Sequence, residues 1–212
     1  MSTPREQREP LNSSTQTPAK PGWWQRFRLY WVSDHAWLRA MLPNFHKVNA
    51  ELFRSGHPGY RTLKRARALG VTSVLSLRGE ADSVATLLER DACAELGLEL
   101  RFLALRSTVL PSPSDLLELV AQLRDMPKPM LVHCKSGSDR TGLAATLYRH
   151  VIDGEPLSRA RQAFSWRYGH VSRGKAGVIH GMLDAYAAAH ADTGIGFEDW
   201  VSQSYDPDAL VR

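Results

Sequence analysis

The sequence contains only two cysteines, Cys93 and Cys134, among its 212 residues. Two cysteines this far apart do not provide a disulfide framework, and they do not have the spacing of a zinc site. We therefore expect neither a disulfide scaffold nor a structural metal, and we expect no cofactor. This cysteine usage favours a reducing compartment.

The sequence also lacks an apolar run long enough to span a bilayer, and its amino terminus has no apolar signal core. We therefore expect a soluble, cytoplasmic protein. Residues 1–21 are rich in Ser, Thr, Pro and Gln and should form a disordered arm, because they carry too little apolar surface to offset the entropy of ordering. Aromatic residues alternate with arginines in Trp23–Trp31. This segment fits a helix packed on the domain, or a helix that lies peripherally on an anionic membrane surface.

The composition is that of a basic globular protein. Lys and Arg number 27 against 22 Asp and Glu, giving a formal net charge of +5, and 43% of residues are hydrophobic. The chain can bury one sizeable core, so we expect one main domain. The charge favours anionic partners, such as a phosphorylated protein, a small phosphorylated substrate or an acidic membrane surface. Nucleic-acid binding would rest on charge alone, and we do not expect it.

Hydrophobic periodicity and turn residues predict strands that alternate with helices. Composition divides the chain into four segments: a disordered arm (1–21), a helical extension (22–46), the main domain (47–192) and an acidic, loosely ordered tail (193–212). Within the main domain we predict an extended piece Lys47–Phe53 and the strands Val71–Leu77, Leu98–Leu105 and Pro129–His133. The predicted helices are Tyr60–Leu69, Ser83–Leu96 capped by Asp82, Pro113–Met126, the segment after the loop as far as Gly154, Leu157–Trp166 and Gly177–Ala189.

This alternation predicts an α/β fold with a mostly parallel central sheet flanked by helices, because parallel neighbours need crossover helices. Ligands of such folds bind beyond the carboxyl ends of the strands. Cys134 directly follows the apolar strand that ends at His133, so it lies where a ligand is expected.

A short loop, His133–Gly142, joins that strand to the next helix. Its backbone N–H groups can turn inward, and the helix that begins near Arg140 directs its positive dipole end at the same point. The loop can therefore hold a phosphate dianion. The same field stabilises a thiolate, which makes Cys134 a candidate nucleophile.

The other loop residues suit supporting roles. Arg140 offers a planar fork that can hold two phosphate oxygens, and Gly137 permits the backbone turn. The Thr141 hydroxyl can be directed at the sulfur, and His133 can orient the loop through hydrogen bonds. The remaining candidates for phosphate binding are Lys135 as a point charge at the rim, Ser136 and Ser138 in the loop, and Arg78 at the end of another strand, where pairing with Glu80 or Glu89 is equally compatible.

Five residues separate Cys134 from Arg140, and Thr141 follows. His-Cys, five residues, then Arg and Ser or Thr resembles the signature of the protein tyrosine and dual-specificity phosphatase superfamily. The segments Phe53–Pro58, Leu77–Gly79 and Arg167–His170 are similar to the small bacterial dual-specificity-like members, so the resemblance extends over about Lys47–Tyr186. It implies a metal-independent hydrolysis of phosphomonoesters in two steps, through a cysteinyl-phosphate.

The sequence departs from that superfamily in the position of the general acid. Many members carry an Asp on the loop after the strand that precedes the signature, but Leu105–Ser114 contains no acidic residue. Asp139, directly before Arg140, resembles the acid of the myotubularin-type lipid phosphatases, and it could instead hold the loop by bonding backbone amides. Asp115 is the other candidate, although its place in a capping box explains it without chemistry. We favour Asp139 as the acid.

Several functions stay compatible with this loop. The substrate could be a protein phosphotyrosine or phosphoserine/threonine, or a lipid or inositol phosphate. A non-catalytic phosphate-binding module and a sulfurtransferase are further alternatives. Cys93 fits a core position, or a partner for Cys134 in a protective disulfide under oxidation.

Overall fold

The computed structural model describes residues 44–80, 83–106, 109–169 and 177–210. The predicted arm 1–21, almost all of the helical extension 22–46, and the segment Trp23–Trp31 lie outside these ranges. No helix within them combines the length and apolar character that a membrane span needs.

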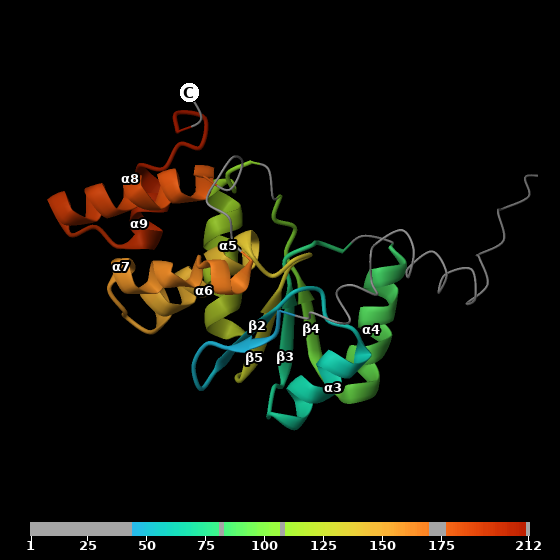
Figure 1. Cartoon of the computed structure of the whole chain (residues 1–212). Helices are drawn as coiled ribbons and strands as arrows, with labels where there is room; N and C mark the ends of the chain where they lie inside the picture. The colour runs from blue at the N-terminus through green and yellow to red at the C-terminus, as the bar shows by residue number, and fades with distance from the viewer. Residues whose placement is uncertain (1–43, 81–82, 107–108, 170–176, 211–212) are drawn as a thin grey trace, which may run out of the picture.

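The described chain forms a five-stranded sheet surrounded by helices (Figure 1). The strands are β1 (His46–Lys47), β2 (Leu52–Ser55), β3 (Ser73–Ser76), β4 (Glu99–Phe102) and β5 (Met130–His133). The α-helices are α3 (Tyr60–Ala68), α4 (Val84–Leu96), α5 (Pro113–Asp125), α6 (Asp139–Leu147), α7 (Leu157–Ala160), α8 (Gly177–Thr193) and α9 (Phe197–Gln203).

The strand order is β1-β2-β5-β3-β4, in which only the β1–β2 pair is antiparallel. This arrangement confirms the predicted α/β class and the mostly parallel sheet. The central strand β5 pairs with β2 on one side and β3 on the other. The loop that follows β5 is therefore flanked by the segments that follow both neighbours.

The two faces of the sheet bury different clusters, as the alternation of side chains along a strand requires. On β5, Met130 and Val132 belong to the larger cluster with α5, α6, α8 and α9, whereas Leu131 belongs to the smaller cluster with α3 and α4. Figure 1 shows α3 and α4 on one side of the sheet and the remaining helices on the other. A sheet covered on both faces leaves its strand ends as the place for a site.

Two helix starts show how local sequence sets the boundaries. Helix α5 begins with the predicted capping box, in which the Ser112 hydroxyl accepts from the Asp115 N–H at 3.2 Å and the Asp115 carboxylate accepts from the Ser112 N–H at 3.1 Å. The cap predicted for α4 was wrong. Ser83, not Asp82, is the N-cap, because its side chain accepts a hydrogen bond from the Thr86 N–H.

The carboxyl-terminal third differs from the prediction in two places. The helix expected over Leu157–Trp166 is interrupted: α7 ends at Ala160, and two short 3-10 turns follow, Arg161–Ala163 and Trp166–Tyr168. The tail after Thr193, which we expected to be loosely ordered, contains α9. Phe197 and Trp200 of α9 are buried in the larger core cluster, and the Tyr205 hydroxyl donates to the carbonyl of Pro111 at 2.8 Å.

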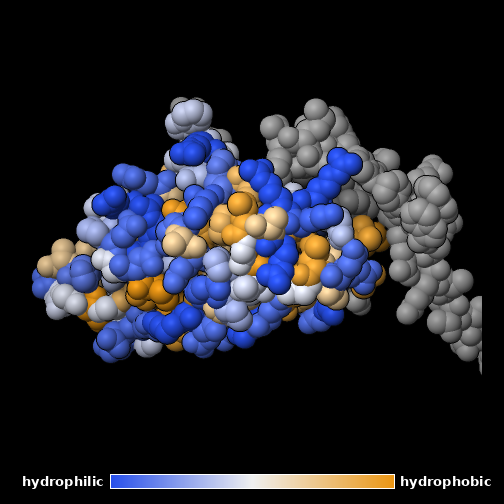
Figure 2. All heavy atoms as spheres, turned by 90° about the horizontal axis from the view of Figure 1, so that it is seen from below, coloured by the Kyte–Doolittle hydropathy of each residue, from blue (hydrophilic) through white to orange (hydrophobic). Residues whose placement is uncertain are grey.

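Figure 2 views the molecule from below, at the end of the sheet where the parallel strands begin. Hydrophobic residues on this face form separate groups divided by hydrophilic ones. No continuous apolar surface is visible there among the described residues. The loop after β5 lies at the opposite end of the sheet.

Candidate active site

Cys134 lies directly after β5, at the floor of the loop that leads into α6. Only 2% of its surface is exposed, and its Sγ accepts a hydrogen bond from the Gly137 N–H at 3.3 Å. The loop therefore closes around the sulfur through its own backbone. Helix α6 begins at Asp139, so the positive end of its dipole is directed toward the loop, as predicted.

Gly137 is the residue that allows this closure. Its φ is +79°, and a Cβ placed there would lie 2.6 Å from the backbone N of Gly56 and 2.6 Å from the carbonyl carbon of Ser55. Only glycine fits both the left-handed backbone and the close approach of the segment after β2. The loop is thus pressed against that neighbouring segment.

Three loop carbonyls are held from outside the loop. The Lys135 carbonyl accepts from the His57 N–H at 3.1 Å, the Ser136 carbonyl from Asn44 Nδ2 at 3.0 Å, and the Gly137 carbonyl from Arg54 Nη2 at 2.7 Å. In a trans peptide the N–H points opposite to the C=O. Because these carbonyls bond to groups outside the loop, the N–H groups that follow them can face the sulfur and form an anion cradle, as the Gly137 N–H does.

Arg140 is anchored by one end of its guanidinium group. Nη1 donates to the carbonyl of Leu77 at 3.1 Å and to that of Leu105 at 3.0 Å. These two carbonyls follow β3 and β4, which pair with each other. Both bonds use the same nitrogen, so the edge formed by Nε and Nη2 is the part suited to a bidentate contact with phosphate oxygens.

Beneath the loop, the His133 imidazole contacts the buried carboxylate of Glu89 of α4. Nε2 of His133 contacts Oε1 of Glu89, and Nδ1 lies 3.3 Å from the Cys134 carbonyl. His57 Nδ1 approaches the other Glu89 oxygen at 3.8 Å. Burial alone would raise the pKa of Glu89, but His133, His57 and Arg78 together lower it below the usual value. Glu89 thus remains a carboxylate that fixes the orientation of His133.

His57, Glu89 and His133 also form a cluster with the composition of a metal site. Their candidate ligand atoms all lie within 4.8 Å of one another, and all three residues are buried. Glu89 and His133 contact each other directly, and His133 precedes Cys134 in the chain. We interpret the cluster as a set of buried contacts that supports the loop.

The other predicted site residues lie in or near the loop. Ser136 and Ser138 share a hydrogen bond between their hydroxyls at 2.8 Å, and the side chains of Lys135 and Ser136 are exposed. Thr141 is fully buried, and its hydroxyl has no hydrogen-bond partner among the described residues, so no bond to the sulfur is seen. Arg78 contributes to the lowered pKa of Glu89, whereas Glu80 pairs with Arg90.

The two candidates for the general acid are placed differently. Asp139 is the first residue of α6, next to Arg140, and is partly exposed. Asp115 uses its carboxylate to cap α5. The Asp115 carboxylate is thus used by the cap, whereas Asp139 lies at the end of α6 that follows the loop.

Cys93 lies away from the loop sulfur. It belongs to the smaller core cluster with α3 and α4, whereas Cys134 belongs to the larger one. Burial and the charge of Glu89 raise the pKa of Cys93 to about 12. Both cysteines are free, and Cys93 has the environment of a core residue.

Sequence reasoning missed the residues that support the loop from below, namely Arg54, His57 and Glu89. Arg54 and His57 stand in the segment Phe53–Pro58, whose resemblance to bacterial phosphatases was the only available signal. Glu89 appeared only as an alternative partner of Arg78. Each contacts the loop across a long stretch of sequence, which no local pattern reveals.

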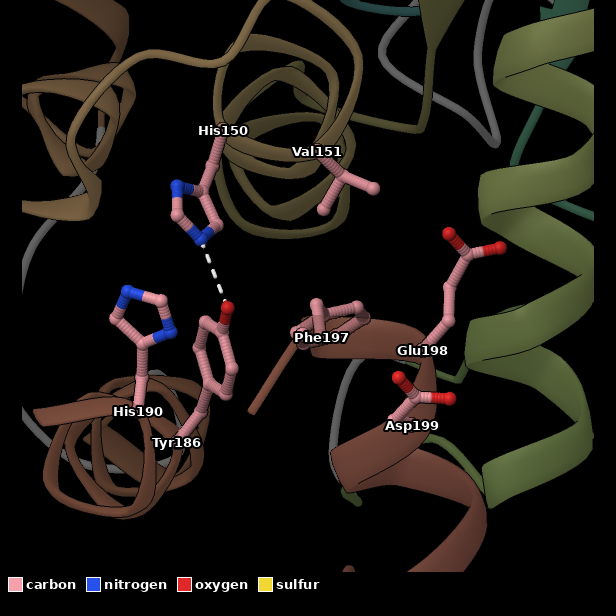
Figure 3. Close-up of a pocket in the computed structure, with 8 residues that line it drawn as sticks. His150, Val151, Tyr186, His190, Phe197, Glu198 and Asp199 are labelled. Carbon is pink, nitrogen blue, oxygen red and sulfur yellow. Dashed lines mark hydrogen bonds between the residues drawn. The ribbon is translucent and has the colours of Figure 1, made fainter. Parts of the chain in front are cut away.

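A separate pocket lies among α8, α9 and the π-helical turn Tyr148–Ile152 (Figure 3). It has a volume of about 520 Å³ and contains His150, Tyr186, His190 and Phe197, with Glu198 and Asp199 at its edge. The His150 Nε2 and the Tyr186 hydroxyl lie 3.0 Å apart in a hydrogen bond. The pocket contains no residue of the loop around Cys134, so we do not assign the chemistry to it.

Comparison with known proteins gives a consistent picture. Residues 39–175 match a family model described as "DSP-PTPase phosphatase fused to NAD+ Kinase". The dual specificity protein phosphatase TpbA of Pseudomonas aeruginosa strain UCBPP-PA14 is 30% identical over 162 residues, which are 72% of this chain and 65% of that protein. The match to TpbA of strain PAO1 covers 129 residues at 30% identity, or 56% of this chain and 53% of the relative. The chain thus spans less than two thirds of the length of these relatives.

Solved structures show the same fold. The crystal structure of P. aeruginosa TpbA has a TM-score of 0.53 at 21% identity and covers 80% of this chain and 89% of its own. The catalytic domain of the PP-IP phosphatase SIW14 from S. cerevisiae has a TM-score of 0.55 at 19% identity, over 71% and 93% of the two chains.

Proposed function

Because this chain belongs to the family of dual-specificity-type phosphatases that the matching model describes, we propose that it hydrolyses phosphomonoesters with Cys134 as the nucleophile. One observation carries the proposal. The Gly137 N–H bonds to the Cys134 sulfur, and three carbonyls of the same loop are held by groups outside it. Such a cradle binds a phosphate group and favours the anionic sulfur.

The proposed reaction has two steps. The Cys134 thiolate attacks phosphorus, an S–P bond forms, and the P–O bond to the leaving group breaks. Arg140 and the loop N–H groups hold the equatorial oxygens, while Asp139 gives a proton to the leaving oxygen. In the second step, Asp139 takes a proton from water, which attacks phosphorus. The S–P bond breaks and inorganic phosphate leaves with the thiolate restored.

We assign the remaining loop residues to phosphate binding and support. Lys135 adds positive charge at the rim, and the backbone of Ser136, Gly137 and Ser138 provides N–H donors. His133, fixed by Glu89, holds the loop from below. Two further assignments are the Thr141 hydroxyl, which is buried and available to the departing sulfur, and Arg78, which adds to the positive field.

We propose a phosphorylated protein side chain as the substrate, with phosphotyrosine first. A TpbA variant with serine at its position 132 has been crystallised in complex with pTyr. Lipid and inositol phosphates are the second candidate, since the exposed Lys135 at the rim suits a substrate with several phosphates. Two other neighbours in fold are a PP-IP phosphatase and PTPMT1 in complex with PI(5)P.

The direct test is release of inorganic phosphate by the full chain in EDTA. We expect turnover of para-nitrophenyl phosphate and of a phosphotyrosine peptide, with EDTA causing no loss. Inositol hexakisphosphate and phosphatidylinositol phosphates in mixed micelles form the second arm. Release of phosphate from the inositol compounds alone would show that the substrate is an inositol or lipid phosphate and not a protein. No release from any of these compounds would leave a non-catalytic phosphate-binding role.

Asp139→Asn is expected to slow hydrolysis of a phosphotyrosine peptide by about 100-fold, the usual contribution of a general acid. The loss in kcat/KM on para-nitrophenyl phosphate should be much smaller, because nitrophenolate leaves without a proton. The measurement is kcat/KM on both substrates across pH, because kcat/KM reports the first step, whereas kcat also contains the second step, in which Asp139 acts as the base for both substrates. Asp115→Asn is the control and should keep both rates, since Asp115 caps α5.

Two results would change the assignment of the acid. Equal losses on both substrates would give Asp139 a role in holding the loop. A leaving-group-dependent loss in Asp115→Asn, with normal rates in Asp139→Asn, would move the proton donor to Asp115.

A further inference from the structure

Arg54 of β2 is a charged side chain with 0% of its surface exposed. Its Nη1 donates to the Ala163 carbonyl and its Nη2 to the Gly137 carbonyl, both at 2.7 Å. The Tyr168 ring lies over the guanidinium group, with 3.9 Å between Cζ and the ring centroid. Arg54 therefore connects the loop around Cys134 to the turns that follow α7.

Among the described residues, the charge of Arg54 has no carboxylate partner. No ion pair joins it to an acidic side chain in the part of the chain that the structure describes, and its Nε is buried without a hydrogen-bond partner there. Burial lowers the pKa of Arg54 to about 10, while Tyr168 and Cys134 act in the opposite direction. The group remains cationic at neutral pH. A buried cation of this kind is costly unless an anion lies near it.

Arg54 also sets the orientation of one peptide group. It holds the Gly137 carbonyl away from the sulfur, so the N–H of Ser138 in the same peptide points the other way, toward the anion site. The N–H of Gly137 already bonds to Sγ. The N–H groups of Gly137 and Ser138 are thus both directed at the anion site, and the orientation of the Ser138 N–H depends directly on Arg54.

We propose that Arg54 is a positioning residue of the catalytic loop, which turns the Gly137–Ser138 peptide toward the bound anion and neutralises the Cys134 thiolate and the phosphate from below. The proposal deepens the proposed function and rests on it only in placing an anion in the loop. Arg54 does not touch the reacting atoms. Its action runs through the backbone and through its charge.

The test uses measurements that do not need turnover. Cys134 is alkylated with iodoacetamide across pH, and inorganic phosphate is titrated to protect it, in the wild type, Arg54→Met and Arg54→Lys. Thermal melting checks that each variant folds. Arg149→Met is the matched control, because Arg149 is also mostly buried and bonds to the Ala160 carbonyl near the same turns, but does not contact the loop.

In Arg54→Met we expect phosphate protection to weaken on the order of tenfold and the pH midpoint of alkylation to rise by about one unit, the size of effect that one buried charged hydrogen bond supplies. In Arg54→Lys the pH midpoint of alkylation should return most of the way to the wild-type value, because lysine keeps the positive charge. Protection by phosphate should stay weak, because lysine lacks the planar guanidinium group that bonds to two carbonyls. Arg149→Met should match the wild type in both.

The proposal would be overturned if folded Arg54→Met had the same protection by phosphate and the same pH midpoint of alkylation as the wild type. If that variant does not melt cooperatively, Arg54→Lys decides, and wild-type phosphate protection in it would overturn the proposal. The two proposals can fail separately. Absent phosphatase activity with these shifts present would reject the catalytic function alone, whereas normal turnover without the shifts would reject the role of Arg54 alone.

Discussion

Cys134→Ser is expected to reduce the turnover of para-nitrophenyl phosphate by at least roughly 10⁴-fold, to the background rate. A serine hydroxyl at the loop floor stays neutral near pH 7, so the cradle would hold phosphate opposite a poor nucleophile. The loop backbone and Arg140 remain, and binding of inorganic phosphate should therefore change by only a few fold. The measurements are initial rates and phosphate binding by calorimetry.

Cys93→Ser is the control for that substitution. Cys93 is buried in the cluster with α3 and α4, and burial and Glu89 raise its pKa to about 12, so it should not act as a nucleophile. Its serine variant should keep wild-type turnover in any fraction that folds. Substantial turnover in Cys134→Ser would contradict the cysteinyl-phosphate, and trapping of phosphate on the wild-type cysteine by rapid acid quench would provide direct support.

Arg140→Lys is expected to lower kcat/KM by about 10²–10³-fold, the usual loss when an aligned donor to the transition state is removed. The guanidinium group has two roles in the proposal: Nη1 bonds to the carbonyls of Leu77 and Leu105, and the other edge would hold the phosphate. A lysine ammonium is a single point charge and cannot do both. The loss should fall mostly on kcat, because the fork matches the trigonal bipyramidal phosphorus better than the substrate.

The matched control is Arg124→Lys on α5. Arg124 forms an exposed, bidentate pair with Glu198, so its replacement should alter stability slightly and leave the rates unchanged. Steady-state kinetics on para-nitrophenyl phosphate and vanadate inhibition would separate catalysis from ground-state binding. Wild-type kcat in Arg140→Lys would show that only the charge of Arg140 matters.

The strand–loop–helix arrangement around Cys134 could be predicted because it is contained in consecutive residues. Cys134, Gly137 and Arg140 stand at fixed offsets between an apolar strand and a helix, so their placement needs little beyond local geometry. The sheet could be predicted for a similar reason, since buried parallel strands read as short apolar runs.

The support beneath the loop could not be predicted from local patterns. Glu89 lies on α4 and meets His133 only because β3 and β5 pair and α4 packs beside them. Arg54 reaches Gly137 across the β2–β5 pair. A buried charge has no local signature in the sequence, because its partners are chosen by the tertiary fold.

The segment after Thr193 was predicted to be loosely ordered because of its acidic residues, and the spacing of its apolar residues was not considered. Phe197, Trp200 and Val201 fall three and four residues apart, which is the interval of one helix face. The acidic residues Glu198 and Asp199 occupy the same short segment. The apolar spacing, rather than the net charge, decided that this segment packs on the domain.

Because the carbonyls of the loop are held outward, phosphate binding and substrate selection would use different parts of the loop. In the proposed reaction, main-chain N–H groups hold the phosphate, and every residue except proline supplies such a group. Lys135 and Ser136, in contrast, are exposed at the rim of the loop. The chemistry and the choice of molecule that carries the phosphate therefore depend on different atoms. Substitutions at positions 135 and 136 should therefore change the preferred ester and leave the proposed phosphate cradle in place.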